Sequence, residues 1–155
     1  QWEIKGALKI LYATDGSDYS KKTGNILTSI PFPEDTEVTI LNVNPATHIS
    51  IPDRFLVEVG DRVKESVARI REAEATRSDL IIKEAREILG KRFKKADVSL
   101  RFGDPSIEIL NEASSLRADI IAMGSSGLRG IKGMLGSVSR YVLGHSECSV
   151  LIGKI

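Results

Sequence analysis

Short runs rich in β-branched and aliphatic residues alternate along this chain with longer stretches of helical periodicity. The short runs cover residues 7–13, 37–43, 97–102, 119–123 and 149–152. They are too short for helices, and several are nearly continuous in valine, isoleucine and leucine, as is typical of strands buried on both faces of a parallel sheet. The alternation predicts βαβ units, whose right-handed crossovers give an open parallel sheet with helices on both faces.

Three of the intervening helices are defined mainly by their apolar spacing. The first is predicted over residues 20–30 and the second over about residues 54–93, where Ser78 could begin a separate helix. The sequence leaves open whether this long stretch is one helix or two. The last helix is predicted over residues 137–143, with Gly144 in position to end it.

The helix after the third strand has the clearest start signal. Asp104 can accept hydrogen bonds from the first free N–H groups, and Pro105 suits the first helical position, where its missing N–H costs nothing. Ile107, Leu110 and Ala113 then recur at helical spacing. We expect these three side chains to form the face that packs on the sheet.

Charge and cysteine content exclude several classes of protein. The chain has 22 lysines and arginines against 21 acidic residues, and this balance argues against a nucleic-acid-binding surface. Its 155 residues are enough for one core without a disulfide, and Cys148 is its single cysteine. No apolar run approaches the ~20 residues of a membrane helix. Because a lone thiol suits a reducing compartment, we expect a cytoplasmic protein.

Glycine recurs at every third position of the segment GSSGLRGIKGMLGSVS, at residues 124, 127, 130, 133 and 136. Triplets without proline cannot form a collagen helix, so a flexible surface loop or an anion site remains. Glycines allow a close approach of the backbone to phosphate and positive φ, so that successive N–H groups converge. The helix start at Ser137 and Val138 adds free N–H groups and a positive dipole end. The segment therefore predicts a phosphate site, to which Arg129 and Lys132 could add charge.

Other predicted strand ends should lie beside this segment, because ligands of open parallel sheets bind beyond the carboxyl ends of the strands. The first strand ends at Ala13, followed closely by Asp15. Asp15 either caps a turn with Gly16 and Ser17, or accepts from a ribose hydroxyl or adenine amine, or holds Mg²⁺ through water. Val43, at the end of the second strand, is either an apolar wall for a base or part of the core.

The sequence lacks the motifs of several other nucleotide-binding and catalytic sites. No Gly-Lys-Ser/Thr closes the glycine segment as in a Walker loop, and no Gly-x-Gly-x-x-Gly follows the first strand. His48 is expected in a loop and His145 after the last helix, and neither pairs with a nucleophile. We therefore assign no catalytic residues, and any ATP hydrolysis would depend on Mg²⁺ and positioning alone and would be slow.

Two glycine motifs and four longer segments carry a family resemblance. Gly124-Ser125-Ser126-Gly127 is followed, after eight residues, by Gly136-Ser137, and the longer segments are KILYATDGSDYS, VTILNV, GDPSIEILNEA and ADIIAMGSSG. In these features the chain resembles the nucleotide-binding branch of the universal stress protein family. The resemblance implies one domain over residues 1–155, with a five-stranded parallel sheet in the order 3-2-1-4-5. This Rossmann-like fold is of the adenine-nucleotide α-hydrolase type.

The resemblance also implies a ligand, a dimer and a set of site residues. Family members of this branch bind ATP, with Mg²⁺ on its phosphates, and commonly dimerise through the last strand, here residues 148–154. Carried over by position, the residues around adenine and ribose are Ala13, Asp15 and Val43. Those around the rest of the nucleotide, chiefly its phosphates, are Met123, Gly124, Ser125, Gly127, Gly136, Ser137 and Val138. The loop between Gly127 and Gly136 is one residue shorter than the family pattern, which could limit its reach to the terminal phosphate.

Three functions are compatible with these features. The first is a dimeric ATP-binding regulator of the stress response, in which the nucleotide orders the glycine segment and changes a surface for a partner. The second is an adenine-nucleotide α-hydrolase, but such enzymes carry Ser-Gly-Gly-x-Asp-Ser after the first strand, whereas this chain has Thr14-Asp15-Gly16-Ser17-Asp18. The third is a dimerisation module without nucleotide, which the short loop favours and the retained glycines oppose.

Overall fold

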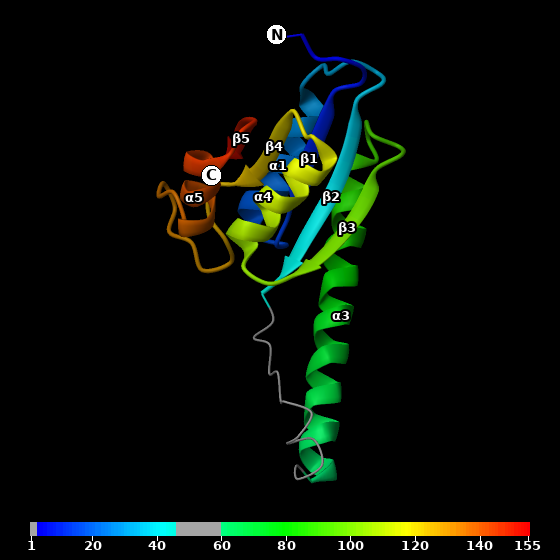
Figure 1. The fold of residues 1–155 in the computed structure, drawn as a ribbon, viewed down its shortest axis with the longest axis vertical. Coiled ribbons are helices and arrows are strands. Elements are labelled where there is room, and N and C mark those ends of the chain that lie inside the picture. The colour runs from blue at the N-terminus through cyan, green and yellow to red at the C-terminus, as the bar shows by residue number, and fades with distance from the viewer. Residues whose placement is uncertain (1–2, 46–59) are drawn as a thin grey trace.

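The five predicted strands form one parallel sheet. The computed structural model describes residues 3–45 and 60–155. The strands are β1 (Lys9–Ala13), β2 (Glu37–Asn44), β3 (Asp97–Phe102), β4 (Ile120–Gly124) and β5 (Ser149–Gly153). All four neighbouring pairs are parallel, in the order β3-β2-β1-β4-β5 (Figure 1). This topology confirms the predicted fold class, and the strand bounds agree with those predicted to within two residues.

Helices cover both faces of this sheet and enclose a core on each. They are α1 (Asp18–Ser29), α3 (Asp61–Leu89), α4 (Pro105–Leu116) and α5 (Ser137–His145). Along β1, Ile10 and Tyr12 enter the core on the face of α1 and α3, whereas Leu11 and Ala13 enter the core on the face of α4 and α5. This division follows from the alternation of side chains along a strand, and it explains why the central strands are apolar throughout.

The long second helical stretch is a single helix, α3. Its last turns are anchored, since Ile81, Ala85 and Leu89 are buried. Residues 61–77 are mostly exposed and extend past the carboxyl edge of the sheet (Figure 1). Ser78 therefore does not begin a separate helix. The predicted start near Arg54 and the loop that contains His48 lie outside the described residues.

Helices α1 and α4 begin at capping side chains. Ser17 caps α1, which starts at Asp18, two residues before the start expected from the sequence, and the Ser17 Oγ accepts from the Ser20 amide at 3.3 Å. Asp104 caps α4 as predicted, since its Oδ1 accepts from the Ser106 and Ile107 amides at 2.9 and 3.3 Å. These bonds fix where each helix starts relative to the end of the preceding strand.

Two sequence predictions about helices were wrong. Leu110 and Ala113 pack on the core as predicted, but Ile107 is 42% exposed. Ile109 and Glu112 are buried on this side as well, and Glu112 pairs with Arg101 of β3 beneath the helix. Gly144 does not end α5, which continues to His145. There the chain leaves the helix in an extended conformation at Ser146, whose amide donates to the Val142 carbonyl at 2.8 Å, so no glycine is required.

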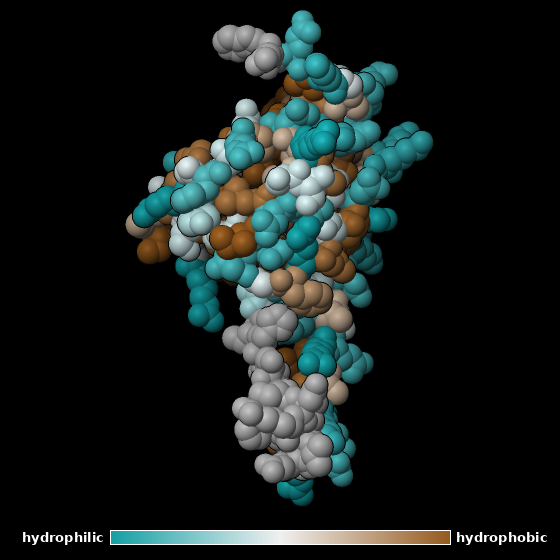
Figure 2. All heavy atoms as spheres, viewed as in Figure 1, coloured by the Kyte–Doolittle hydropathy of each residue, from teal (hydrophilic) through white to brown (hydrophobic). Residues whose placement is uncertain are grey.

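β3 and β5 are the two edge strands of the sheet. Val98, Leu100 and Phe102 of the edge strand β3 are exposed. On the face of the molecule that Figure 2 shows, hydrophobic side chains lie between hydrophilic ones. Cys148 is half-buried beside the edge strand β5 and packs against the core on the α4 and α5 face. Among the described residues, no helix is both long and apolar enough to cross a membrane.

Candidate functional site

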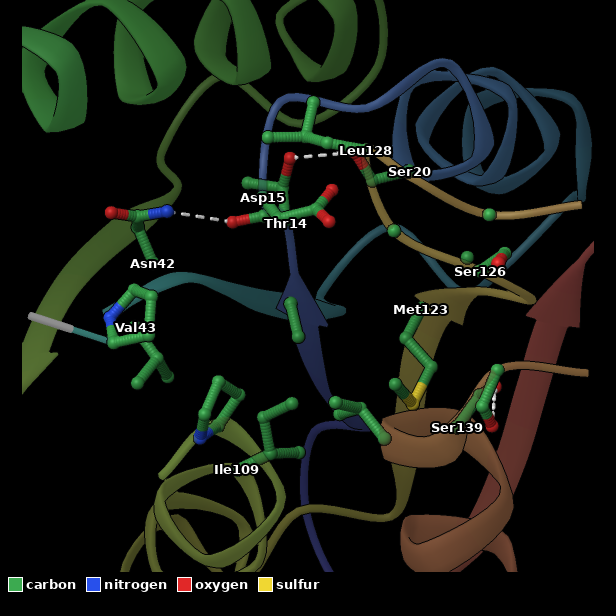
Figure 3. A pocket seen from close by; sticks show the side chains of 18 of the residues that line it. Thr14, Asp15, Ser20, Asn42, Val43, Ile109, Met123, Ser126, Leu128 and Ser139 are labelled. Atoms are coloured by element: carbon green, nitrogen blue, oxygen red, sulfur yellow. Dashed lines mark hydrogen bonds between the residues drawn. The ribbon is translucent and has the colours of Figure 1, made fainter. Parts of the chain in front are cut away.

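A cavity of about 840 Å³ lies beyond the carboxyl ends of β1, β2 and β4 (Figure 3). Its walls are the ends of these strands, the middle of α3, the start of α4 and residues 125–136, which we call the glycine loop. Such a volume is typical of pockets that hold small molecules. The position agrees with the general rule that open parallel sheets bind ligands at this edge.

All but one of the ten predicted site residues line this cavity: Ala13, Asp15, Val43, Met123, Gly124, Gly127, Gly136, Ser137 and Val138. The exception is Ser125, which is 1% exposed. Its amide donates to the Gly153 carbonyl at 2.8 Å, and its carbonyl accepts from the Gly136 amide at 2.7 Å. Ser125 therefore holds the two ends of the glycine loop together rather than facing a ligand.

The side of the cavity next to α4 is apolar. Val43, Ile109 and Met123 surround the same open space in Figure 3. Val43 lines the cavity and also packs against the core on this face. A slot with apolar walls between strand ends suits the flat face of an aromatic ring.

A network of hydrogen bonds fixes the turn between β1 and α1. The Thr14 hydroxyl donates to Ser20 Oγ at 3.0 Å and accepts from the Gly16 amide at 3.2 Å. Asn42 Nδ2 donates to the Thr14 carbonyl at 2.8 Å, which joins this turn to β2 (Figure 3). Gly16 has a φ of 79°, a conformation that favours glycine. The turn is therefore rigidly placed before any ligand arrives.

Asp15 caps the turn with Gly16 and Ser17, and its carboxylate also lines the cavity. Its Oδ1 accepts from the Ser17 amide at 2.9 Å and so stabilises the turn. The carboxylate also lines the cavity, and a Cβ atom built on Gly127 would lie 2.9 Å from Oδ2. Asp15 thus presents a fixed acceptor between the apolar slot and the glycine loop.

Tyr12 supports this turn from below. Its side chain is fully buried, and its hydroxyl donates to the Ser20 carbonyl at 2.5 Å. Burial, together with the nearby Asp15 charge, raises the pKa of Tyr12 to about 12. The phenol therefore remains protonated, and a donor, throughout the physiological pH range.

The glycines of the loop are required mainly by contacts within the protein. A Cβ on Gly124 would lie 2.7 Å from the Tyr19 backbone, and one on Gly130 would lie 1.8 Å from Ser126 Oγ. Of the five glycines at every third position, only Gly133 has a positive φ. The expectation that they provide positive φ is wrong for the other four. Their absent side chains instead let the loop pack tightly against α1 and against itself.

Free N–H groups are concentrated at the start of α5. Its N-cap, Gly136, has no side chain to cap the helix, in contrast to Ser17 of α1 and Asp104 of α4. The amides of Ser137 and Val138 come before the first intrahelical bond, which the Arg140 amide donates to the Gly136 carbonyl at 3.0 Å. These donors and the positive end of the helix favour an anion.

Charged side chains of the glycine loop and of α3 also line the cavity. Arg129 of the glycine loop lines it, but Lys132, the other predicted cation, does not. Glu74, Arg77 and Ser78 of α3 also line it, and the sequence interpretation missed all three. These residues lie one or two helical turns before Ile81, which packs against the turn at Gly16. This helical spacing is the sequence feature that could have indicated them. Within the described ranges, no three His, Cys, Asp or Glu residues form a metal cluster.

Sequence comparison finds relatives that match most of the chain. Residues 7–154 match the sequence model of the Universal stress protein family. The Universal stress protein YxiE of Bacillus subtilis is 31% identical over 154 residues, which cover 93% of this chain and 97% of the relative.

Structural comparison finds the same fold in solved proteins. The hypothetical protein MJ0577 superposes with a TM-score of 0.74 and 27% identity over 95% of each chain. A universal stress protein in complex with cAMP has a TM-score of 0.64 and 21% identity, over 97% of this chain and 98% of that one. A universal stress protein from Archaeoglobus fulgidus with dAMP has a TM-score of 0.62 and 17% identity, over 96% and 98% of the two chains.

Proposed function

This chain belongs to the universal stress protein family, and we propose that it is a regulatory module of the stress response that binds adenine nucleotides, ATP in particular. One observation carries the proposal. A single cavity combines an apolar slot, the Asp15 carboxylate and the uncapped start of α5. Universal stress proteins solved with cAMP and with dAMP share this fold.

Adenine is the part of the ligand that suits the apolar slot. In our proposal the base lies between Val43 and Met123, near Ala13 at the end of β1. The Asp15 carboxylate, already oriented by the Ser17 amide, accepts from a ribose hydroxyl at the mouth of this slot. Because the acceptor is fixed in advance, little conformational entropy is lost when the sugar binds.

The phosphates then reach the start of α5 and the glycine loop. Ser137 and Val138 provide amide donors, and Arg129 adds positive charge. The loop is one residue shorter than the family pattern, but the bond from the Gly136 amide to the Ser125 carbonyl still brings the start of α5 to the cavity. Mg²⁺ would bind through the nucleotide phosphates, because oxygen ligands suit this ion.

Regulation by nucleotide occupancy needs a second surface, which we assign to the last strand. β5 lies at the edge of the sheet, where it pairs with β4 on one side only. We propose that residues 148–154 form a homodimer contact through this edge, since an unpaired strand edge is a template for a second strand. The free thiol of Cys148 is in keeping with a cytoplasmic protein.

Calorimetry with ATP, ADP and AMP in the presence of Mg²⁺ tests the proposal. We expect saturable binding of adenine nucleotides, with one site per chain, and sedimentation as a dimer. Absence of binding to all three nucleotides would instead favour a dimerisation module without nucleotide. Release of pyrophosphate from ATP in the presence of candidate substrates would favour the α-hydrolase reaction.

A further inference from the structure

A cation on α3 lines the cavity and has no partner among the residues that the structure describes. Arg77 lines the cavity wall, and within the described part of the chain its guanidinium forms no salt bridge or hydrogen bond. Glu74, one turn earlier, lines the same wall, but its Oε2 accepts from Asn44 Nδ2 at 3.5 Å and is thus turned toward the end of β2. The charge of Arg77 is therefore available to a ligand.

The packing of α3 against the turn between β1 and α1 determines the position of Arg77. Ile81 lies against the turn between β1 and α1, since a Cβ on Gly16 would be 2.9 Å from Ile81 Cγ1. Arg77 precedes Ile81 by one helical turn, roughly 6 Å along the axis, and so lies beyond the strand ends rather than beside the core. The apolar slot is on the opposite face of the sheet, next to α4. The strand ends thus separate Arg77 from a base in that slot.

The glycine loop connects the two sides of the cavity. It ends at the start of α5, on the face of α4, but its middle leans toward α1, where the Tyr19 hydroxyl donates to the Gly130 carbonyl at 3.4 Å. On this side Gly127 contacts Asp15. A phosphate chain that begins at α5 and follows the loop would therefore run toward the face that α3 covers.

We propose that Arg77 recognises the phosphates beyond the first and so makes the site prefer ATP to AMP. A guanidinium presents paired N–H donors that match phosphate oxygens, and no carboxylate of residues 3–45 or 60–155 pairs with Arg77. AMP would end near the start of α5, whereas the outer phosphates of ATP would reach the α3 wall. This inference rests on the proposed function, because it requires an adenine nucleotide in the cavity.

The test compares dissociation constants of ATP, ADP and AMP for the wild type and Arg77→Ala by calorimetry. We expect the variant to weaken ATP binding by roughly tenfold or more and AMP binding by less than about threefold, as for loss of one charged hydrogen bond. Arg77→Lys should recover part of the ATP affinity. Arg71→Ala is the matched control, because Arg71 is exposed on the same helix and does not line the cavity.

The outcomes separate this inference from the proposed function. If Arg77→Ala lowered the affinities for ATP and AMP equally, or left ATP affinity unchanged, the inference about Arg77 would be wrong, but the proposed function would stand. Failure of the wild type to bind any of the three nucleotides would overturn both. Circular dichroism and the urea midpoint of Arg77→Ala should match the wild type, since the side chain is exposed and forms no ion pair within the described part of the chain.

Discussion

Gly127 lies against Asp15, so that a Cβ atom on the glycine would be 2.9 Å from Oδ2 of the carboxylate. This contact joins the glycine loop to the tip of β1, two segments more than a hundred residues apart in the chain. Because the Ser17 amide already holds Asp15 by Oδ1, the carboxylate cannot move aside freely. The spacing between loop and turn is therefore set by the absence of a side chain at Gly127.

Gly127→Val should abolish most nucleotide binding while leaving the fold intact. The side chain would displace Asp15 or lift the loop from the cavity, but Gly127 has no positive φ that valine would strain. We expect ATP affinity to fall at least about tenfold, equivalent to the loss of one charged hydrogen bond. Calorimetry measures this change, and Gly144→Ala is the control, because a Cβ there meets nothing within 4 Å. Binding equal to wild type would show that the contact has no role in the site.

Gly124→Ala should destabilise the fold itself. Its Cβ would lie 2.7 Å from the carbonyl carbon of Tyr19 and 2.8 Å from the Ser20 amide, and the backbone of α1 cannot yield as a flexible side chain can. We expect a loss of about 1–3 kcal/mol in the free energy of unfolding, as for other overpacked sites. Urea denaturation measures it against Gly144→Ala. A Gly124→Ala variant as stable as the wild type would refute the close packing of β4 against α1.

Tyr12 should make the protein lose stability at alkaline pH. Burial raises its pKa in the folded state to about 12, above the ordinary value of 10.0. The contribution of the buried Tyr12 phenol to the free energy of unfolding is therefore complete below pH 10, and it is lost as the pH rises from 10 through 12. At 1.36 kcal/mol per pKa unit, this loss amounts to about 2–3 kcal/mol of unfolding free energy.

Urea midpoints measured from pH 8 to 12 on wild type and Tyr12→Phe check this prediction. The variant should lose about 1 kcal/mol at neutral pH, through its missing hydrogen bond to the Ser20 carbonyl, but should decline less steeply above pH 10. Tyr141→Phe is the control, because Tyr141 is exposed. Parallel pH profiles for Tyr12→Phe and wild type would contradict the assignment.

The sheet could be predicted because its central strands are apolar on both faces and the strands are separated by segments with helical spacing. Helix orientation could not be predicted equally well. Of the face predicted for α4, Leu110 and Ala113 pack on the core, but Ile107 is exposed. The ion pairs of Arg101 with Glu108 and Glu112 bring Glu112 to the buried side instead. Such pairs join residues of different elements and leave no periodic signal.

Most of the candidate site could be predicted because parallel strands deliver their carboxyl ends to one edge. Ser125 does not line the cavity, since its backbone bonds to Gly153 and Gly136 join residues that are far from it in the sequence. Arg77 was missed, because its approach to the cavity depends on how Ile81 packs against Gly16. In both cases tertiary contact, not local sequence, decides which way the residue faces.

The most direct test of this account is an amide chemical-shift titration of the ¹⁵N-labelled protein with Mg²⁺-ATP. We expect saturating shifts that are largest at the amides of Gly127, Ser137 and Val138, with smaller ones at Asp15 and Val43. Shifts confined to residues away from the cavity, such as those of β3, or no shifts at saturating nucleotide, would contradict the claim that these main-chain donors bind phosphate.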